Sequence, residues 1–410
     1  MSNTTNPIPA EAFGPLKGAL VLELCSTIAG PACARLLADF GATVIKVEPP
    51  GGDSMRSMGK HVGDTSLYAA TLLRNKQAVA IDMKTPEGKK LVRALADKAD
   101  VLVENFRPGV LERLGLGYEE LSKTNPGLVM VRISGYGQTG PYALRPGYGA
   151  ICEAVAGVRH MTGDPDRPPA RVAIATTDYL TATYAAFGTA MALLARTTSG
   201  RGQMVDVALY ETAFSQMEAY ISAYEKLNFI PKRVGPNLPN MAPNSLYPTS
   251  DGAWVLIAAN SDPTFKRLID VMGQPELLQD PRFCTIRARG TNLDECNGVV
   301  GEWTRTLPAD EVVRLLVEAE VPVSRVNTLA DIYKDPHYAA REMLVKVPHP
   351  TLGHTTQHGI VPKMSATPGR IVRSGPDYAQ DTRVVLQREL GLSDAELDRL
   401  QESGAIASAP

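Results

Sequence analysis

The feature that most limits the possible folds of this chain is a strand–helix–strand pattern within residues 18–48. The apolar run Ala19–Leu24 follows a glycine and predicts a buried strand. A helix follows the turn at residues 29–31, ends at Gly41 and leads into a second strand, Thr43–Val47. A pattern of this length is typical of a βαβ unit, in which the two strands pair in parallel.

The same alternation of strands and helices continues as far as residue 134. Apolar runs predict strands at Gln77–Asp82, Val101–Glu104 and Val129–Ser134, and amphipathic patterns predict helices at Pro86–Ala99 and Val110–Leu114. This alternation indicates an open α/β sheet, which carries its ligand site at the carboxyl ends of the strands.

The composition changes near residue 230, where a second and smaller domain is predicted. Residues 230–248 hold five prolines and three asparagines, which favour an irregular linker or loop. Beyond this segment, a strand at Trp254–Ala259 and helices at Pro263–Met272 and Pro308–Glu320 indicate an α/β or α+β domain. The last helix, Ser393–Glu402, is opened by Ser393 as its cap.

Charge and cysteine content narrow the class of protein. The 410 residues include 42 basic and 44 acidic side chains, a balance that argues against a nucleic-acid-binding surface. The five cysteines are scattered without a CxxC pair, which argues against a disulfide scaffold or thiolate zinc site and fits a reducing compartment. The first residues hold neither a basic stretch nor an apolar core, so we expect no signal or transit peptide and a cytoplasmic location.

One long segment, Val172–Ala195, is uncharged apart from Asp178. Its length suits a membrane span, but a carboxylate in lipid is costly, so we expect a buried core helix instead. Asp178 is placed to cap the N-terminus of that helix. A catalytic role is the alternative, and the two are compatible because a carboxylate beside a helix N-terminus is kept ionised and nucleophilic.

Three loops lie where a ligand site of an open sheet is expected. The turn at residues 29–31 could bring backbone amides close to a ligand, although its sequence is not a dinucleotide fingerprint. The segments 104–109 and 134–141 also follow predicted strands, and each is either part of a site or an ordinary turn.

Basic and aromatic residues near these loops leave two interpretations open. Phe106 and Arg107 could contact a nucleotide, or they could be a core and a surface residue. Lys84, Arg107 and Arg113 could together neutralise phosphate, or they could be solvated. The histidines follow no metal-binding spacing and no Gly-x-Ser-x-Gly elbow occurs, so we expect neither a metal site nor a serine hydrolase.

Taken in order, these segments resemble the class III CoA-transferase family (CaiB/BaiF type), which includes formyl-CoA, carnitine and succinyl-CoA–dicarboxylate CoA-transferases. The resemblance covers nearly the whole chain. It is carried by LKGALVLELCSTIAGPACARLLADFGATVIKVE (16–48), AIDMKTPEGKKLV (80–92), DVLVENFRPGVLERLGLGYEEL (100–121), ISGYGQTGPY (133–142), TTDY (176–179) and SGRGQMVDVALYE (199–211).

The resemblance implies a two-domain architecture and an obligate pair of chains. The fold it implies is α/β, with a Rossmann-like large domain formed by residues 1–225 and 336–410 and a smaller central α/β domain at 226–335. Two such chains would interlock like linked rings into a homodimer. The partners it implies are an acyl-CoA thioester and a small carboxylate as substrates, with no permanently bound cofactor, metal, nucleic acid or membrane.

The resemblance also implies a nucleophile and a set of CoA-binding residues. Asp178 matches the catalytic aspartate, which would attack the thioester carbonyl to form a mixed anhydride and then an aspartyl-CoA thioester. Backbone amides near residues 29–30, or in a flexible loop of the small domain, would stabilise the oxyanions. The positions implied for CoA are Lys84, Asn105, Phe106 and Arg113 around the adenine nucleotide, and Ile28, Ile81 and Leu209 as apolar or shaping residues.

Departures from the family pattern concern the substrate rather than the nucleophile. Pro49 stands where some members have a cofactor-binding arginine, a role that Arg56 could take over. Ile28 replaces a glutamine, Gly149 stands where many members carry an acidic residue, and residues 240–244 replace a glycine-rich loop. Each departure argues against oxalate or formate as a substrate.

Other functions on the same fold remain as alternatives. A 2-methylacyl-CoA racemase needs a histidine–aspartate pair, whereas Tyr148 stands near the histidine position. An acyl-CoA hydrolase and a catalytically silent CoA-binding protein are the others. For a CoA-transferase, we expect succinyl-CoA or a related dicarboxylyl-CoA as donor, and a small acceptor such as a methyl-branched or hydroxy dicarboxylate.

Overall fold

The structure is a computed structural model that describes residues 12–409. These residues pack into two compact units. The first comprises the chain up to Val158, Val172–Ala219 and the chain from His337, and the second comprises Arg159–Arg171 and Tyr220–Pro336. The expectation that no signal or transit peptide is present concerns residues 1–11, which lie outside the described residues.

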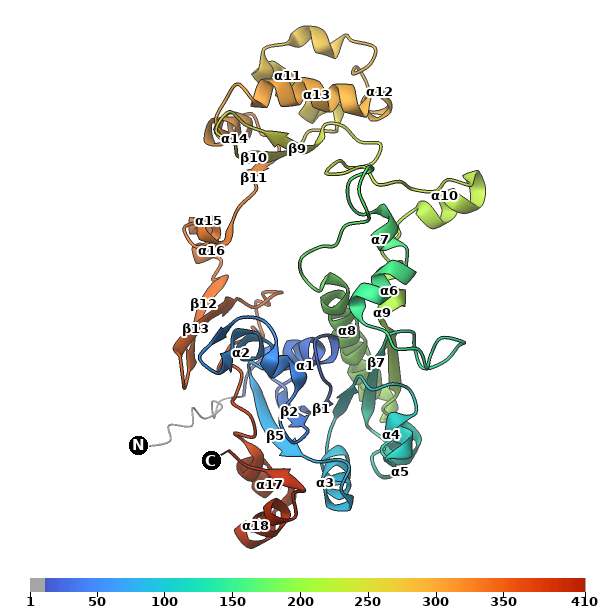
Figure 1. The fold of residues 1–410 in the computed structure, drawn as a ribbon, viewed down its shortest axis with the longest axis vertical. Coiled ribbons are helices and arrows are strands. Elements are labelled where there is room, and N and C mark those ends of the chain that lie inside the picture. Colours follow the sequence, from blue (N-terminus) through green and yellow to red (C-terminus); the bar gives the residue numbers. More distant parts are fainter. Residues whose placement is uncertain (1–11, 410) are drawn as a thin grey trace. The chain divides into compact units, whose positions relative to one another are not determined.

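A mainly parallel sheet organises the first unit, with seven strands in the described part of the chain (Figure 1). In spatial order they are β14 (Ile406–Ala407), β5 (Lys76–Ile81), β2 (Thr43–Glu48), β1 (Leu20–Leu24), β6 (Val101–Glu104), β7 (Val129–Ser134) and β8 (Met204–Ala208). Only the β14–β5 pair is antiparallel. From β1 the chain winds outward to β2 and β5, and then passes β1 again to add β6, β7 and β8. This is the strand order of a doubly wound Rossmann fold, in which ligands bind where the winding reverses, here between β1 and β6.

Helices cover both faces of this sheet. One face carries α1 (Ala29–Asp39), α2 (Leu67–Leu72), α8 (Thr176–Ser199) and α9 (Leu209–Phe214), and the other carries α3 (Pro86–Ala96), α4 (Val110–Arg113), α5 (Tyr118–Thr124), α17 (Thr382–Leu390) and α18 (Asp394–Glu402). Successive strand residues alternate between the two apolar cores, so that Val21 joins the first and Leu22 the second. Because both faces are buried, the strands are mainly apolar, as the sequence analysis expected, although buried charged residues such as Glu23 and Lys46 stand among them.

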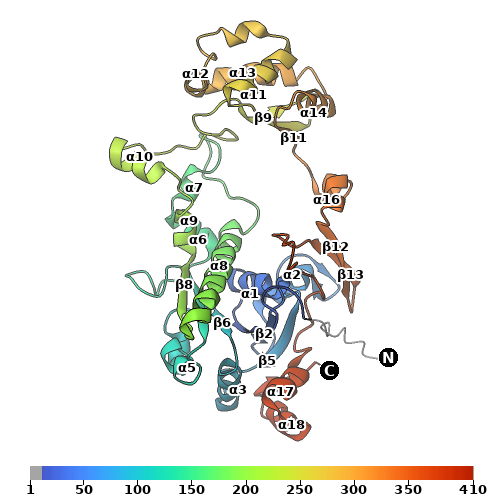
Figure 2. The same cartoon turned by 180° about the vertical axis from the view of Figure 1, so that it is seen from behind.

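The C-terminal part of the chain returns to this sheet. Ile406 of β14 pairs with Ile81 of β5, and Figures 1 and 2 both show α17 beside β5. The hairpin of β12 (Leu344–His349) and β13 (Gly353–His358) packs near α2, where the Gln357 side chain donates a hydrogen bond of 3.0 Å to the Ala70 carbonyl. Segments from the two ends of the sequence therefore stabilise one sheet.

The second unit has a small antiparallel sheet and its own core. Its strands are β9 (Asn244–Pro248), β10 (Trp254–Ala258) and β11 (Val323–Arg325), in the order β11-β10-β9. Its helices are α10 (Tyr220–Leu227), α11 (Asp262–Met272), α12 (Ile286–Thr291), α13 (Leu293–Thr304), α14 (Ala309–Glu318) and α15 (Leu329–Ile332), with a 3₁₀ turn at Pro275–Leu278. Arg289 is fully buried in this unit and donates to the carbonyls of Ala242, Phe283 and Asn260.

Short elements complete the description. They are the 3₁₀ turn Ser54–Ser57, the two-residue strands β3 (His61–Val62) and β4 (Thr65–Ser66), α6 (Gly149–Val155), α7 (Val158–Met161) and α16 (Pro336–Ala340). The predicted α/β class is confirmed, with β6 and β7 at the predicted residues. The Ser393 cap is also confirmed, because its hydroxyl accepts a hydrogen bond from the Glu396 amide. The predicted linker 230–248 was partly wrong, since its last five residues pair with β10 as strand β9.

The prediction of a fully buried helix at Val172–Ala195 was also wrong in part. The helix α8 begins at Thr176, and its large side chains Tyr184, Phe187, Met191 and Leu194 are 43–62% exposed in the single chain. The opposite side is buried against α1 and the sheet through small residues such as Ala182 and Ala185. Within the described residues, no helix combines the length and apolar character needed to cross a membrane.

Candidate active site

A pocket of about 190 Å³ opens at the reversal point between β1 and β6. Its walls are formed mainly by the turn after β1, the loops after β6 and β7, and the first turn of α8. Its lining is Ser26–Ala29, Asn105–Pro108, Ile133–Gly135, Ala143, Arg145–Tyr148, Asp178 and Leu209. The pocket therefore lies where the strand order predicts a ligand site.

Asp178 enters this pocket from the first turn of α8. Ala175 precedes the helix and Asp178 is its third residue, so the interpretation of Asp178 as the helix cap was wrong. The carboxylate lies against the backbone of Gly149, the first residue of α6. A Cβ at Gly149 would come within 2.1 Å of Asp178 Oδ2, so only glycine allows this approach.

The charge of Asp178 affects two neighbouring groups. Burial, with a further contribution from the Asp178 carboxylate, raises the pKa of the Cys152 thiol to about 11. Burial, the hydrogen bond with Tyr179 and the Asp178 charge raise the pKa of Tyr68 well above its ordinary value. Both groups therefore stay protonated at neutral pH.

The turn between β1 and α1 forms another wall of the pocket and is held in a strained conformation. Thr27 has a φ of +69°, a value that β-branched residues rarely adopt. The Asn105 side chain holds the preceding residue, accepting from the Ser26 amide at 2.9 Å and donating to the Ser26 carbonyl at 2.8 Å. The Asp53 carboxylate accepts from the Thr27 amide at 3.3 Å. Strain of this kind persists only where surrounding contacts determine the conformation.

A buried group of charges lies behind this turn. Lys46 Nζ lies 2.7 Å from Asp53 Oδ2 and 3.3 Å from Glu23 Oε1, and it also donates to the Cys25 carbonyl. Lys76 Nζ lies 2.7 Å from Glu23 Oε2. All four charged side chains are nearly inaccessible, so removing any one would leave an uncompensated charge, typically at about 3–5 kcal/mol. These pairs fix the position of Asp53 and hence of the turn.

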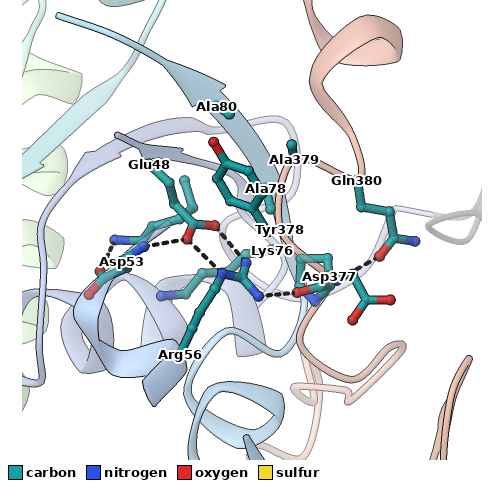
Figure 3. Close-up of polar contacts among 12 residues, drawn as sticks. Glu48, Asp53, Arg56, Lys76, Ala78, Ala80, Asp377, Tyr378, Ala379 and Gln380 are labelled. Atoms are coloured by element: carbon teal, nitrogen blue, oxygen red, sulfur yellow. Dashed lines mark hydrogen bonds and ion pairs between the residues drawn. The ribbon is translucent and has the colours of Figure 1, made fainter. Parts of the chain in front are cut away.

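Glu48 connects this buried group to Arg56 (Figure 3). It accepts a hydrogen bond of 2.9 Å from the Asp53 amide and pairs with the Arg56 guanidinium at 2.6 Å. Arg56 also donates to the Pro376 carbonyl at 3.0 Å. Arg56 is thus engaged by protein groups and is not free for the phosphate contact considered in the sequence analysis.

At the end of β6, Glu104 holds the segment that follows. Its carboxylate accepts from the Phe106 amide at 2.7 Å and from Arg132 Nε at 2.7 Å. Burial raises the pKa of Glu104 to about 6, although the charge and hydrogen bond of Arg132 act in the opposite direction. Phe106 thereby has a fixed backbone at the mouth of the pocket.

The structure brings five of the eight predicted site residues together. Asp178, Ile28, Asn105, Phe106 and Leu209 line the same pocket. The other three lie outside that lining. Ile81 is the last residue of β5 and is buried in the core on the α3 side of the sheet. Lys84 is exposed on the loop after β5, and Arg113 is exposed at the end of α4. The catalytic role of Asp178 and the contact of the other seven residues with CoA stay predictions.

Three basic side chains that are unpaired in the described part of the chain lie on the segments that follow β5 and β6. Within residues 12–409, the side chains of Lys84, Arg107 and Arg113 form no ion pair or hydrogen bond with the protein. Arg107 lines the pocket itself. Unpaired cations at the carboxyl end of a sheet suit an anionic ligand such as a phosphate. Also within the described residues, no group of three potential metal ligands comes together.

Sequence reasoning missed the charged group behind the turn and the position of Arg145 in the pocket. The signal for the first was present, because Glu23 and Lys46 each interrupt an apolar strand, and buried charges require partners. No local signal distinguished Arg145 from other surface arginines. Its place in the pocket depends on the fold of the loop after β7.

Comparison with known proteins gives a consistent result. The sequence model of CoA-transferase family III matches residues 16–382. Succinyl-CoA–D-citramalate CoA-transferase of Chloroflexus aurantiacus is 47% identical over 96% of this chain and 98% of its own length. The succinyl-CoA–L-malate CoA-transferase beta subunit of the same organism is 38% identical over 99% and 100%. A crystal structure of a CaiB/BaiF family protein from Brucella suis aligns with a TM-score of 0.81 and 34% identity, over 92% of this chain and 100% of that one.

Proposed function

The chain belongs to CoA-transferase family III and is a CoA-transferase, and we propose that it moves CoA from a dicarboxylyl-CoA such as succinyl-CoA to a small carboxylic acid. The observation that carries this proposal is the approach of the Asp178 carboxylate to the Gly149 backbone inside the pocket at the sheet reversal point. It places a carboxylate in the pocket, and a carboxylate there is the nucleophile that acyl transfer through a covalent enzyme intermediate requires.

The substrate assignment is supported by the relatives. The two Chloroflexus enzymes are named for succinyl-CoA as donor and for D-citramalate or L-malate as acceptor. Both acceptors are hydroxy dicarboxylic acids. We therefore assign a short dicarboxylyl-CoA donor and a hydroxy or methyl-branched dicarboxylate acceptor to this enzyme.

The mechanism we assign begins with attack of the Asp178 carboxylate on the thioester carbonyl. A carbon–oxygen bond forms, the carbon–sulfur bond breaks, and CoA leaves as a thiolate. The thiolate then attacks the aspartyl carbonyl of the mixed anhydride, releasing the donor carboxylate and leaving an aspartyl-CoA thioester. The acceptor carboxylate attacks this thioester to give a second anhydride and CoA thiolate. Attack of the thiolate on the acceptor acyl carbon yields acceptor-CoA and restores Asp178, without net proton transfer.

The turn before α1 is suited to stabilise the negative charge that develops in these steps. The N–H groups of Ile28, Ala29 and Gly30 have no acceptor within the described residues, and Ile28 and Ala29 line the pocket. Amides at a helix N-terminus point toward anions and carry the positive end of the helix dipole. The hydrogen bonds from Asn105 and Asp53 hold this turn before substrate arrives, which is the requirement for oxyanion stabilisation.

The assembly we assign is a homodimer in the cytoplasm, acting on CoA thioesters as substrates without a permanent cofactor. Support for the homodimer comes from α8, where four large apolar side chains form one exposed face at a spacing of three to four residues. Such a face on a single chain is typical of a protein interface. A second copy of this chain is the partner that fits an obligate dimer.

The test is transfer of CoA from succinyl-CoA to D-citramalate or L-malate by the parent and by Asp178→Ala, with product CoA esters identified by mass spectrometry. We expect Asp178→Ala to lose transfer by at least about 10³-fold, as removal of a covalent nucleophile does, while its Kd for CoA stays within about twofold of the parent. The matched control Asp64→Ala removes an exposed carboxylate and should leave transfer unchanged. A parent rate of transfer in Asp178→Ala would contradict the proposal.

Two further measurements separate the alternatives. Release of free CoA without an acceptor at the rate seen with one would indicate a hydrolase. Deuterium uptake at the α-carbon of a 2-methylacyl-CoA without CoA transfer would indicate a racemase. A histidine needed for that proton exchange does not line the pocket among the described residues.

A further inference from the structure

One arginine shares the pocket with Asp178 and has no role in the mechanism above. Arg145 lies on the loop between β7 and α6, four residues before Gly149, whose backbone contacts the Asp178 carboxylate. The residues between them, Pro146, Gly147 and Tyr148, also line the pocket. The guanidinium is therefore attached to the same short segment that positions the nucleophile.

A series of aromatic rings connects Arg145 to the sheet. Its Cζ lies 3.6 Å from the centre of the Tyr142 ring. Tyr142 packs edge-to-face with Tyr136 at 5.9 Å between ring centres, and Tyr136 is tilted against Tyr210 at 6.0 Å. Tyr136 is only 8% exposed and belongs to the core under α1 and α8. A guanidinium stacked on a ring with this support loses less conformational freedom when it binds a ligand.

The Arg145 guanidinium also has unused hydrogen-bonding capacity. Within residues 12–409, its side chain forms no hydrogen bond or ion pair, and its only polar contact is the stacking on Tyr142. By contrast, Arg132 of the same unit is bound to Glu104 and Glu112. An oriented guanidinium with free donors binds a carboxylate in a two-pronged geometry that no neutral group reproduces.

The second free arginine of the pocket has a different place. Arg107 follows Asn105 and Phe106 at the end of β6, the segment predicted for the adenine nucleotide, whereas Arg145 belongs to the segment that contacts the nucleophile. A dicarboxylyl group bound through one carbonyl to Asp178 carries its second carboxylate only a few bonds away. The cation attached to the Asp178 side of the pocket is thus the one suited to that carboxylate.

On these observations, we propose that Arg145 binds the second carboxylate of the acyl group and selects dicarboxylic over monocarboxylic acids. The inference rests on the proposed function and names the substrate class of the same site. It requires no additional chemistry, because Arg145 acts only by binding. It is a specificity residue that binds the second carboxylate of the donor acyl group and, after the donor acid leaves, that of the acceptor.

The experiment compares two donors that differ only at the far end of the acyl chain. Succinyl-CoA ends in a carboxylate, and butyryl-CoA carries a methyl group at the same position. We expect the parent to prefer succinyl-CoA, and Arg145→Ala to lower kcat/KM for succinyl-CoA by about 30- to 100-fold while changing that for butyryl-CoA by less than about threefold. The Kd for free CoA should stay unchanged in this variant.

Three control variants make the result specific. Arg107→Ala should lower kcat/KM for both donors by the same factor, because we assign it to CoA. Arg145→Lys should recover only part of the succinyl-CoA preference, since an ammonium lacks the two-pronged geometry. Tyr142→Leu should weaken the preference by about 3- to 10-fold, and Tyr142→Phe should keep it, because only the ring supports the guanidinium.

The outcomes distinguish this inference from the proposed function. A parent enzyme that transfers no CoA from any donor contradicts the proposed function itself. A parent that transfers CoA without preferring succinyl-CoA overturns the role of Arg145 together with the dicarboxylyl donor, but leaves the CoA-transferase activity in place. An Arg145→Ala variant that loses both donors equally, or binds free CoA more weakly, overturns only the role of Arg145. Loss of the preference in Arg107→Ala instead would assign the carboxylate to the other arginine and would also overturn it.

Discussion

Substituting Gly149 by alanine tests whether its contact with Asp178 determines the rate of transfer. The added Cβ would lie 2.1 Å from Asp178 Oδ2, whereas ordinary contacts begin at 3.4 Å. The carboxylate must therefore move by about 1.3 Å, because repulsion at shorter distances is steep. Gly149 is the first residue of α6 and has no positive φ, so alanine fits its backbone and favours the helix.

The size of the effect follows from this displacement. A shift of about 1 Å in a reacting group can cost about 10²-fold in rate, or about 2.7 kcal/mol. We expect kcat for CoA transfer to fall by about this factor in Gly149→Ala. The KM for the donor and the Kd for CoA should change by less than about threefold, because the CoA-binding loops are untouched. Thermal unfolding should show a Tm no lower than a few degrees below the parent.

The assay is steady-state transfer from succinyl-CoA, followed by chromatography of the CoA esters. The matched control is Gly298→Ala in α13, because a Cβ at that glycine would meet no atom within 4 Å. This control should transfer CoA at the parent rate. A parent kcat in Gly149→Ala would refute the contact as a determinant of catalysis, and an equal loss in both variants would show that the effect is not specific to Asp178.

Three further predictions concern the turn, a buried acid and the second unit. Thr27→Gly removes the strain at φ +69°, so the free energy of unfolding should stay within about 1 kcal/mol of the parent in urea unfolding. In transfer assays, kcat should fall about tenfold because the turn loses its fixed geometry. Burial raises the pKa of Glu104 from 4.5 to about 6, so between these pH values the folded protein binds more protons than the unfolded chain. The stability that Glu104 contributes is therefore full below pH 4.5 and is lost as the pH rises through 6. The stability advantage of the parent over Glu104→Gln should therefore shrink by about 2 kcal/mol from pH 4 to pH 7 in urea unfolding, and an advantage that grows with pH would contradict the shift. Arg289→Ala leaves three buried carbonyls without their donor and should lower the unfolding free energy by about 3–5 kcal/mol, whereas an unchanged urea midpoint would contradict this role.

Much of the first unit was predictable because its strands are buried on both faces. β6 and β7 occupy the predicted residues, since strands buried on both faces read as short, nearly continuous apolar runs that stand out in the sequence. The boundary of α8 was less predictable. Asp178 resembles a cap in sequence, but the helix begins at Thr176, two residues before it, and Asp178 enters the pocket from the first turn.

The arrangement of the site was predictable only in part, for a physical reason. The segment 104–109 could be placed near the site because parallel strands end at one edge of the sheet, whereas the assignment of Asn105 and Phe106 within it came from the family resemblance. The hydrogen bond between Asp53 and Thr27 joins loops that follow different strands, and no sequence pattern encodes that distance. The same holds for Arg145, whose orientation depends on three tyrosines that meet only in the folded unit.

The position of β14 at the edge of the sheet affects folding during synthesis as well as the stability of the folded sheet. β14 borders β5, yet about 325 residues separate Ile81 from Ile406, and a ribosome adding roughly 5–20 residues per second needs roughly 16–65 seconds to synthesise them. During that interval β5 is an open edge and the apolar face beneath α17 and α18 is uncovered. The second unit emerges within the same interval, so it completes its own core while the sheet that it interrupts is still unfinished.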